Sequence, residues 1–214
     1  MPKFRAQTVV VGVRRSTPQS GPPVISVILI GLGVGAGALA LLALHLLPTG
    51  LSPVRNPVSQ YGITPYRAGY RVQTIAYALA GVGAAIGMAA IPGSSLVVGL
   101  LLLFAASRLA IRWFPMDTPG TTPTVTGVAH GVLAAIAFGS VGLAALRLPT
   151  VLSKDGLDPG IGLGSGVLAA GMLLCFILMA VERRSRSSHY GLVERIFYGS
   201  MTVWLFLVAL LVLP

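Results

Sequence analysis

The feature of the sequence that most constrains the fold is a series of six apolar segments of roughly bilayer-crossing length. The segments cover residues 24–47, 72–91, 95–114, 125–148, 162–181 and 196–213. A transmembrane helix needs about 20 mostly apolar residues, whereas a membrane β-barrel would show alternating segments of about ten. The pattern therefore predicts an all-α, polytopic membrane protein built as a six-transmembrane-helix bundle.

The composition supports a chain that is dissolved largely in lipid. Of the 214 residues, 55% are hydrophobic and 9% are charged, whereas a soluble domain carries roughly 25% charged residues. We expect a basic N-terminal tail over residues 1–23 and a single transmembrane domain over residues 24–214. The apolar run after the tail is longer than the core of a cleaved signal peptide, so the first helix is expected to be retained.

The net charge of +10 favours membrane lipids as partners. The basic residues are spread over the tail and the loops, without a recognition motif or interleaved aromatic residues, so we expect no nucleic acid partner. Lysine and arginine beside transmembrane segments instead suit anionic headgroups. Another membrane protein subunit is the second expected partner, and the sequence predicts neither a cofactor nor a bound metal.

Glycines recur four residues apart within the apolar segments. The pairs are Gly33/Gly37, Gly83/Gly87, Gly127/Gly131 and Gly162/Gly166. Small residues at this spacing let helix backbones approach closely in lipid. The repetition predicts a tightly packed bundle rather than spans arranged around a wide pore.

Polar residues gather in the odd-numbered loops. With six crossings, the first, third and fifth loops lie on one side of the membrane, and the three histidines fall near that side. We therefore predict a polar site at one membrane boundary. The residues expected to converge there are Asn56, Ser59, Tyr61, Arg112, Asp117, Thr121, His130, Glu194, Arg195 and Tyr198.

Two ion pairs are expected within this site, with Asp117 holding Arg112 and Glu194 holding Arg195. Arg108 lies one helical turn before Arg112, on the same face. It either extends its side chain to the headgroups or pairs inside the bundle.

The orientation in the membrane rests on opposing signals. Arginines are more numerous in the odd loops, but the basic tail precedes the first helix, which usually dominates. On that ground we expect both termini in the cytoplasm.

Three short motifs, taken in order, carry a resemblance to a known family. They are Asn56-Pro57-x-Ser59-x-Tyr61, then Phe114-Pro115-x-Asp117 followed by Thr121 and His130, then Glu194-Arg195-x-Phe197-Tyr198. The chain resembles, over residues 24–213, the bacterial integral-membrane proteins grouped as domain of unknown function 998. These are similar to a wider six-helix superfamily that includes DRAM and Sfk-type proteins. The resemblance implies six transmembrane helices, a polar cluster on the odd-loop face and location in the bacterial inner membrane. Gln60 departs from the family pattern, in which an acid is more frequent.

Three functions remain open. We favour a non-enzymatic protein whose polar face binds lipid headgroups or a partner subunit, although the same polar pairs could simply staple the loops together. An intramembrane hydrolase or transferase would use His130 with Asp117 or Glu194 as general base, and Ser59 or a metal-bound water as nucleophile. A zinc set could be drawn from His45, His130 and His189. No histidine pair has i, i+4 spacing and no serine lies in a nucleophile elbow, so no catalytic residue is assigned. A small-molecule transporter is the third possibility, and the shortage of charge in the middle of the spans argues against it.

Overall fold

The computed structural model describes residues 24–154, 159–185 and 189–213. Within these ranges the chain forms six long helices and two short 3-10 helices, and no strand occurs there. The long helices are α1 (Val24–Leu46), α2 (Arg67–Met88), α3 (Ser95–Ala110), α4 (Val125–Lys154), α5 (Pro159–Ser185) and α6 (Tyr190–Leu211). The short ones are η1 (Val58–Ile63) and η2 (Ile111–Trp113).

The helices are those of a multi-pass membrane protein, as the apolar segments predict. Five of the long helices, all except α2, are long and apolar enough to cross a membrane, with η2 counted in the span of α3. Helix α2 carries Arg67, Arg71, Gln73 and Thr74 in its first half, and its buried face is rich in small residues. The all-helical membrane fold is confirmed, whereas a sixth crossing by α2 stays a prediction.

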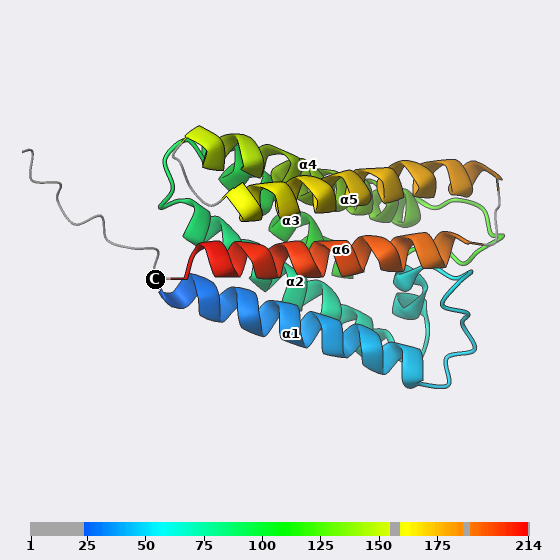
Figure 1. Cartoon of the computed structure of the whole chain (residues 1–214). Helices are drawn as coiled ribbons and strands as arrows, with labels where there is room; N and C mark the ends of the chain where they lie inside the picture. The colour runs from blue at the N-terminus through cyan, green and yellow to red at the C-terminus, as the bar shows by residue number, and fades with distance from the viewer. Residues whose placement is uncertain (1–23, 155–158, 186–188, 214) are drawn as a thin grey trace, which may run out of the picture.

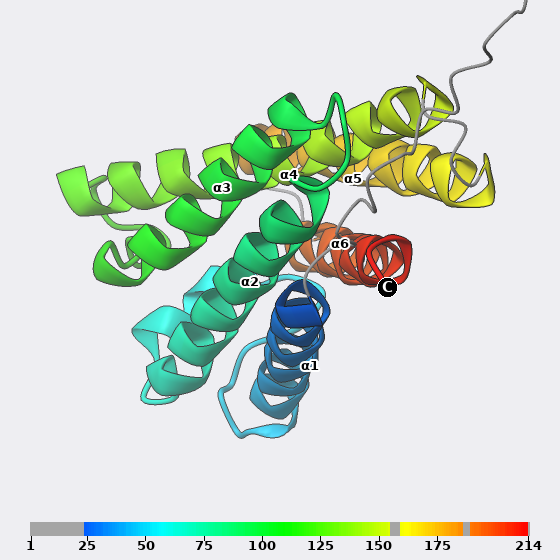
Figure 2. The ribbon, with the colours of Figure 1, turned by 90° about the vertical axis from the view of Figure 1, so that its left-hand side faces the viewer.

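The long helices run side by side, and successive helices run in opposite directions (Figure 1). Residues 47–66 and 114–124 lie together at one end of the bundle, which we call the loop end. The beginning of α1 and the end of α6 lie at the other end. A view along the bundle places α2 between α1 and α3 (Figure 2). The polar segments of the first and third loops therefore share one end of the molecule.

Glycines bring the backbones of α1 and α2 into direct contact. A Cβ atom added to Gly33 would lie 2.5 Å from the carbonyl oxygen of Ala76 and 2.5 Å from the amide nitrogen of Ala80. In the reverse direction, a Cβ on Gly83 would lie 2.9 Å from the carbonyl oxygen of Ser26. Real Cβ atoms do not approach backbone atoms so closely, so the close packing needs glycine at these positions.

A proline inside α4 is compensated by the two helices that follow. Pro149 has no amide hydrogen, so the carbonyl oxygen of Ala145 loses its helical donor. The hydroxyl of Ser165 on α5 donates to that oxygen at 2.8 Å, and the indole nitrogen of Trp204 on α6 donates to the Ser165 hydroxyl at 2.8 Å. One short chain of hydrogen bonds thus joins α4, α5 and α6.

Several helix ends differ from the sequence-based boundaries. Helix α4 continues past Pro149 to Lys154, and α6 begins at Tyr190 instead of residue 196. Hydropathy falls near Glu194 and Arg195, so the sequence-based start of the last helix was placed after these two residues. These two residues are helical because their polar groups find partners in the protein.

Candidate functional site

The guanidinium of Arg195, in the second turn of α6, joins three separate parts of the chain at the loop end. Its Nε donates to Nε2 of His45 at 2.5 Å, at the end of α1. One terminal nitrogen donates to the carbonyl oxygens of Asn56 and Gly191, both at 2.9 Å. The other donates to the hydroxyl of Tyr61 at 3.3 Å. This arrangement, which we call the Arg195 latch, holds the first loop against α1 and α6.

Glu194 faces the interior, unlike its neighbour. Its side chain is buried, and Oε2 accepts a hydrogen bond from the backbone amide of Val58 at 2.6 Å. A second link between the same segments runs from the amide of Leu192 to the carbonyl oxygen of Val54, at 3.0 Å. The expected direct ion pair between Glu194 and Arg195 does not form, because each side chain binds a different part of the first loop; the charge of Arg195 still acts on Glu194 from a distance.

Within the first loop, the amide side chain of Asn56 organises the turn before η1. Its Oδ1 accepts from the amide of Ser52 at 2.8 Å, and its Nδ2 donates to Oε1 of Gln60 at 2.9 Å. Gln60, the position that departs from the family pattern, therefore has a structural role as a hydrogen-bond acceptor.

Asp117 fixes the beginning of α4. Its two carboxylate oxygens accept from the hydroxyl of Thr124 at 2.6 Å and from the amide of Thr124 at 3.1 Å. These hydrogen bonds stabilise the ionised form, so the pKa of Asp117 lies below its ordinary value. The carboxylate fills the space that a side chain on Gly127 would need. The expected Arg112–Asp117 pair is wrong, and Gly127 here accommodates a carboxylate.

Arg112 lies in η2 beside an exposed aromatic ring. Its guanidinium carbon is 3.9 Å from the ring centroid of Trp113, which is a cation–π geometry. The Trp113 side chain is 60% exposed. The Nε of Arg112 has no hydrogen-bond partner in the described part of the chain. Thr121 is exposed, and its hydroxyl bonds within its own turn to the carbonyl oxygen of Thr118.

The side chains of His130 and Ser59, considered above for catalysis, form hydrogen bonds with the third loop. Nδ1 of His130, a buried residue, bonds to the carbonyl oxygen of Phe114 at 2.7 Å. The hydroxyl of Ser59 donates to the sulfur of Met116 at 3.2 Å, which ties the first loop to the third. Among the described residues, no group of three His, Cys, Asp or Glu side chains is arranged to hold a metal.

The structure thus places the ten predicted residues at the loop end or just inside it, in several local groups. Asn56, Tyr61 and Arg195 belong to the latch, while Asp117 caps α4. Arg112 is at the surface. That these residues together bind a ligand stays a prediction.

The sequence analysis left the surroundings of Arg108 open, and the structure places this side chain inside the bundle. Arg108 is 1% exposed, and it donates to Oε1 of the fully buried Gln73 at 2.7 Å. Its guanidinium carbon lies 5.5 Å from the ring centroid of Tyr198. The charge therefore does not reach the headgroups. The signal in the sequence was the polar periodicity of α2, with Tyr70, Gln73 and Tyr77 on one helical face.

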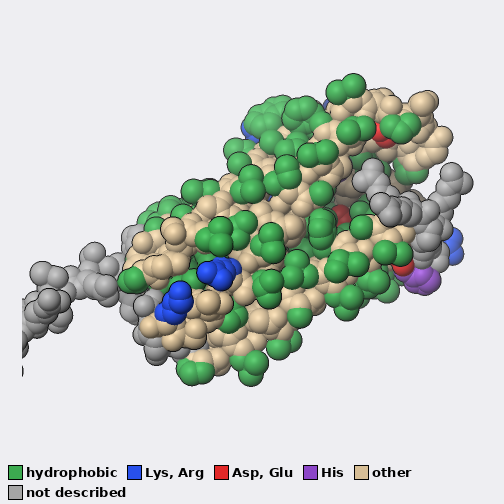
Figure 3. All heavy atoms as spheres, turned by 90° about the horizontal axis from the view of Figure 1, so that it is seen from above, with side chains coloured by type: hydrophobic (Ala, Val, Ile, Leu, Met, Phe, Trp, Pro, Cys, Tyr) green, Lys and Arg blue, Asp and Glu red, His purple; other side chains and the backbone are tan. Residues whose placement is uncertain are grey.

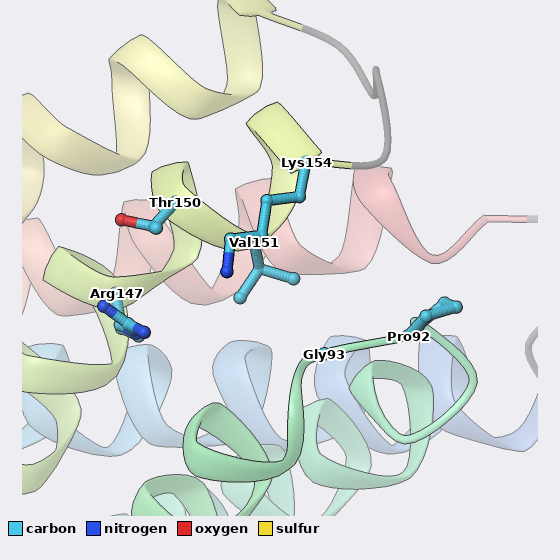
Figure 4. Close-up of a pocket in the computed structure, with 6 residues that line it drawn as sticks. All are labelled: Pro92, Gly93, Arg147, Thr150, Val151 and Lys154. Atoms are coloured by element: carbon cyan, nitrogen blue, oxygen red, sulfur yellow. The ribbon is translucent and has the colours of Figure 1, made fainter.

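A separate hollow lies at the opposite end of the bundle, between the α2–α3 turn and the last turns of α4 (Figure 4). It is lined by Pro92, Gly93, Arg147, Thr150, Val151 and Lys154. None of the predicted site residues lines it. A space-filling view shows a face covered mainly by hydrophobic side chains, with its acidic side chains toward the loop end (Figure 3).

Comparison with known proteins gives one finding. The family model described as "Protein of unknown function (DUF998)" matches residues 31–211. No curated protein and no solved structure gives a significant match. The match covers most of the chain and includes the motifs of the first loop, the third loop and α6. The chain therefore belongs to the DUF998 family of proteins of unknown function.

Proposed function

We propose that this integral membrane protein is not an enzyme and that its loop end binds the headgroups of anionic phospholipids. The cations available for this role are on the rim of the loop end. Arg67 and Arg71, at the start of α2, are exposed, and Arg112 is partly exposed. Arginine forms paired, charge-assisted hydrogen bonds with phosphate oxygens.

The observation that carries the proposal is the stacking of Arg112 on Trp113. Tryptophan is enriched where a membrane protein crosses from hydrocarbon to headgroups. The ring is mostly exposed and belongs to the last residue of the apolar span that comprises α3 and η2. In this proposal the stack on Trp113 holds the guanidinium of Arg112 at headgroup depth, where its terminal nitrogens bind phosphate.

Arg195, which the sequence also suggested as a phosphate ligand, suits a different role. Four hydrogen bonds engage its guanidinium with protein acceptors. In this proposal the Arg195 latch maintains the conformation of the loop end, while Arg67, Arg71 and Arg112 contact the lipid.

In the hydrolase alternative, the charge of His130 acts on Asp117, but no nucleophile is paired with a base among the described residues. A serine nucleophile needs a base within hydrogen-bond reach, and the hydroxyl of Ser59 instead donates to Met116. The Asp117 oxygens are occupied by Thr124.

Native mass spectrometry of the purified protein tests the proposal. The protein is exchanged into micelles that contain equal amounts of phosphatidylglycerol and phosphatidylcholine, and retained lipids are counted. We expect wild type to retain phosphatidylglycerol preferentially and the triple variant R67Q/R71Q/R112Q to lose this preference.

The matched control removes two basic residues at the opposite end, Arg147→Gln and Lys154→Gln, and is expected to leave the lipid preference unchanged. An unchanged preference in the triple variant would refute the proposal. If that variant instead lost a co-purifying protein while it kept its lipids, the loop end would be assigned to a partner subunit.

A further inference from the structure

A continuous set of polar side chains extends from the loop end into the bundle, between α2, α3 and α6. On α6, Glu194, Tyr198 and Thr202 are spaced by four residues and so lie on one face. On α2, Tyr70, Gln73 and Tyr77 lie on the facing side, and Arg108 of α3 stands between the two helices. We call these seven residues the interior stripe. All are buried except Thr202, which is partly buried.

Two hydrogen-bond donors in the interior stripe have no acceptor in the described part of the chain. They are Nε of Arg108 and the side-chain amide nitrogen Nε2 of Gln73. Arg108 already donates to Oε1 of Gln73, which fixes the orientation of the amide and turns Nε2 away from the guanidinium. Buried donors are almost always satisfied, by protein or by ordered water. The Tyr198 hydroxyl lies near both side chains but accepts from neither donor with hydrogen-bond geometry, so an acceptor that is not part of the chain would satisfy both.

The buried charge of Arg108 also calls for an additional hydrogen-bond acceptor. Glu194 is the only carboxylate in the interior stripe, and its electrostatic influence reaches Arg108. Its Oε2 is engaged by the amide of Val58, and no direct ion pair joins it to Arg108 among the described residues. A guanidinium inside a membrane bundle that has neutral groups but no carboxylate in direct contact is costly unless it is also solvated. A bridging molecule that accepts from Arg108 and donates to Glu194 meets both needs.

We infer that the interior stripe binds water in the space where α2, α3 and α6 meet. The water accepts hydrogen bonds from Nε of Arg108 and Nε2 of Gln73, and it donates to Glu194 and to the hydroxyl of Tyr198. A buried water molecule typically makes about three such bonds. This hydrated site is distinct from the headgroup-binding surface of the proposed function.

The hydrated site has an entrance and an inner limit. Glu194 keeps 4% of its surface exposed and lies nearest the loop end, so water enters past its carboxylate. Two helical turns further in, the hydroxyls of Tyr77 and Thr202 bond to each other at 2.7 Å. Leu205, in the next turn of α6, is fully buried in the apolar core. The polar path therefore ends inside the bundle and does not connect the two sides of the membrane.

Hydroxyl-radical footprinting of the intact protein in detergent micelles tests this inference. Radicals generated from bound water oxidise adjacent side chains even when these are buried. The quantity compared is the protection factor, which is the intrinsic reactivity of a residue divided by its measured oxidation rate. Trp204 is the internal control, because it is fully buried and its indole nitrogen is paired with Ser165.

We expect Tyr198 to be several-fold less protected than Trp204 in the wild-type protein. In the variant Q73L/R108M, which removes both unpaired donors, Tyr198 should become as protected as Trp204. Equal protection of the two residues in wild type would overturn the inference on its own, without any variant. If the double variant fails to fold, as loss of protection at Trp204 would reveal, the single variant Gln73→Leu takes its place. It is expected to raise the protection of Tyr198, and an unchanged value would overturn the inference.

Discussion

Replacement of Ser165 by alanine should weaken the contact among α4, α5 and α6 by an amount that the structure lets us calculate. Among the described residues, the Trp204 indole nitrogen donates only to the Ser165 hydroxyl, and this hydroxyl replaces the donor that Pro149 denies to Ala145. Ala145 and Trp204 are both fully buried. A buried group left unpaired costs about 1–3 kcal/mol. S165A should therefore lower the free energy of unfolding by about 2–6 kcal/mol.

Replacement of Pro149 by alanine tests the same hydrogen-bond chain independently. In a P149A background, the new amide at position 149 can donate to the carbonyl oxygen of Ala145, so S165A leaves only Trp204 unpaired. The cost of S165A should then fall by about 1–3 kcal/mol, and the two substitutions should be non-additive, as expected for groups that share one hydrogen-bond chain.

Reversible unfolding in mixed detergent micelles, followed by tryptophan fluorescence, measures both quantities. Ser153→Ala is the matched control, because Ser153 is exposed and its hydroxyl bonds only within its own helix. A loss in S165A no larger than that in S153A would refute the assigned role of Ser165. Equal costs of S165A with and without Pro149 would refute the role of the proline.

Three further predictions follow from the packing and the loop end. Gly33→Ala should lower the free energy of unfolding by about 1–3 kcal/mol through overpacking, whereas Gly35→Ala, which meets no neighbouring atom, should be neutral or slightly stabilising in the same assay. Arg195→Gln should release the first loop, residues 47–66, and speed its cleavage by trypsin; a wild-type cleavage rate would contradict the latch. Because the pKa of Asp117 is depressed in the folded protein, its stabilising effect is present above pH 3.8 and is lost as the pH falls through its lower folded value. Asp117→Asn should therefore be less stable than wild type near neutral pH, and the difference should disappear in acid; a constant difference would contradict this.

Hydropathy and helical spacing were sufficient to predict the membrane fold and the presence of glycines for close helix packing. They were less informative where polar residues are buried. Hydropathy assigns Glu194 and Arg195 to a loop, under the assumption that charged groups face water. In the structure, protein partners satisfy both groups, so α6 begins a turn and a half earlier. The same assumption left Arg108 undecided between headgroups and interior.

The expected ion pairs failed for a geometric reason. Neighbouring residues on a helix point about 100° apart, so Glu194 and Arg195 cannot face each other. Between Arg112 and Asp117 the chain leaves η2 through Pro115, and the carboxylate turns forward to the first residues of α4. Sequence proximity suggested both pairs, but the direction of each side chain depends on the helix that carries it.

The composition of α2 has a consequence for how the chain enters the membrane. Alone, this helix would partition poorly into a bilayer, because its first half carries arginines and buried amide and hydroxyl groups. Helix α1 is far more apolar and presents glycines that fit closely against it. The two would therefore insert best as a preassembled hairpin, in which α1 shields α2 from lipid until α3 and α6 supply the remaining polar partners.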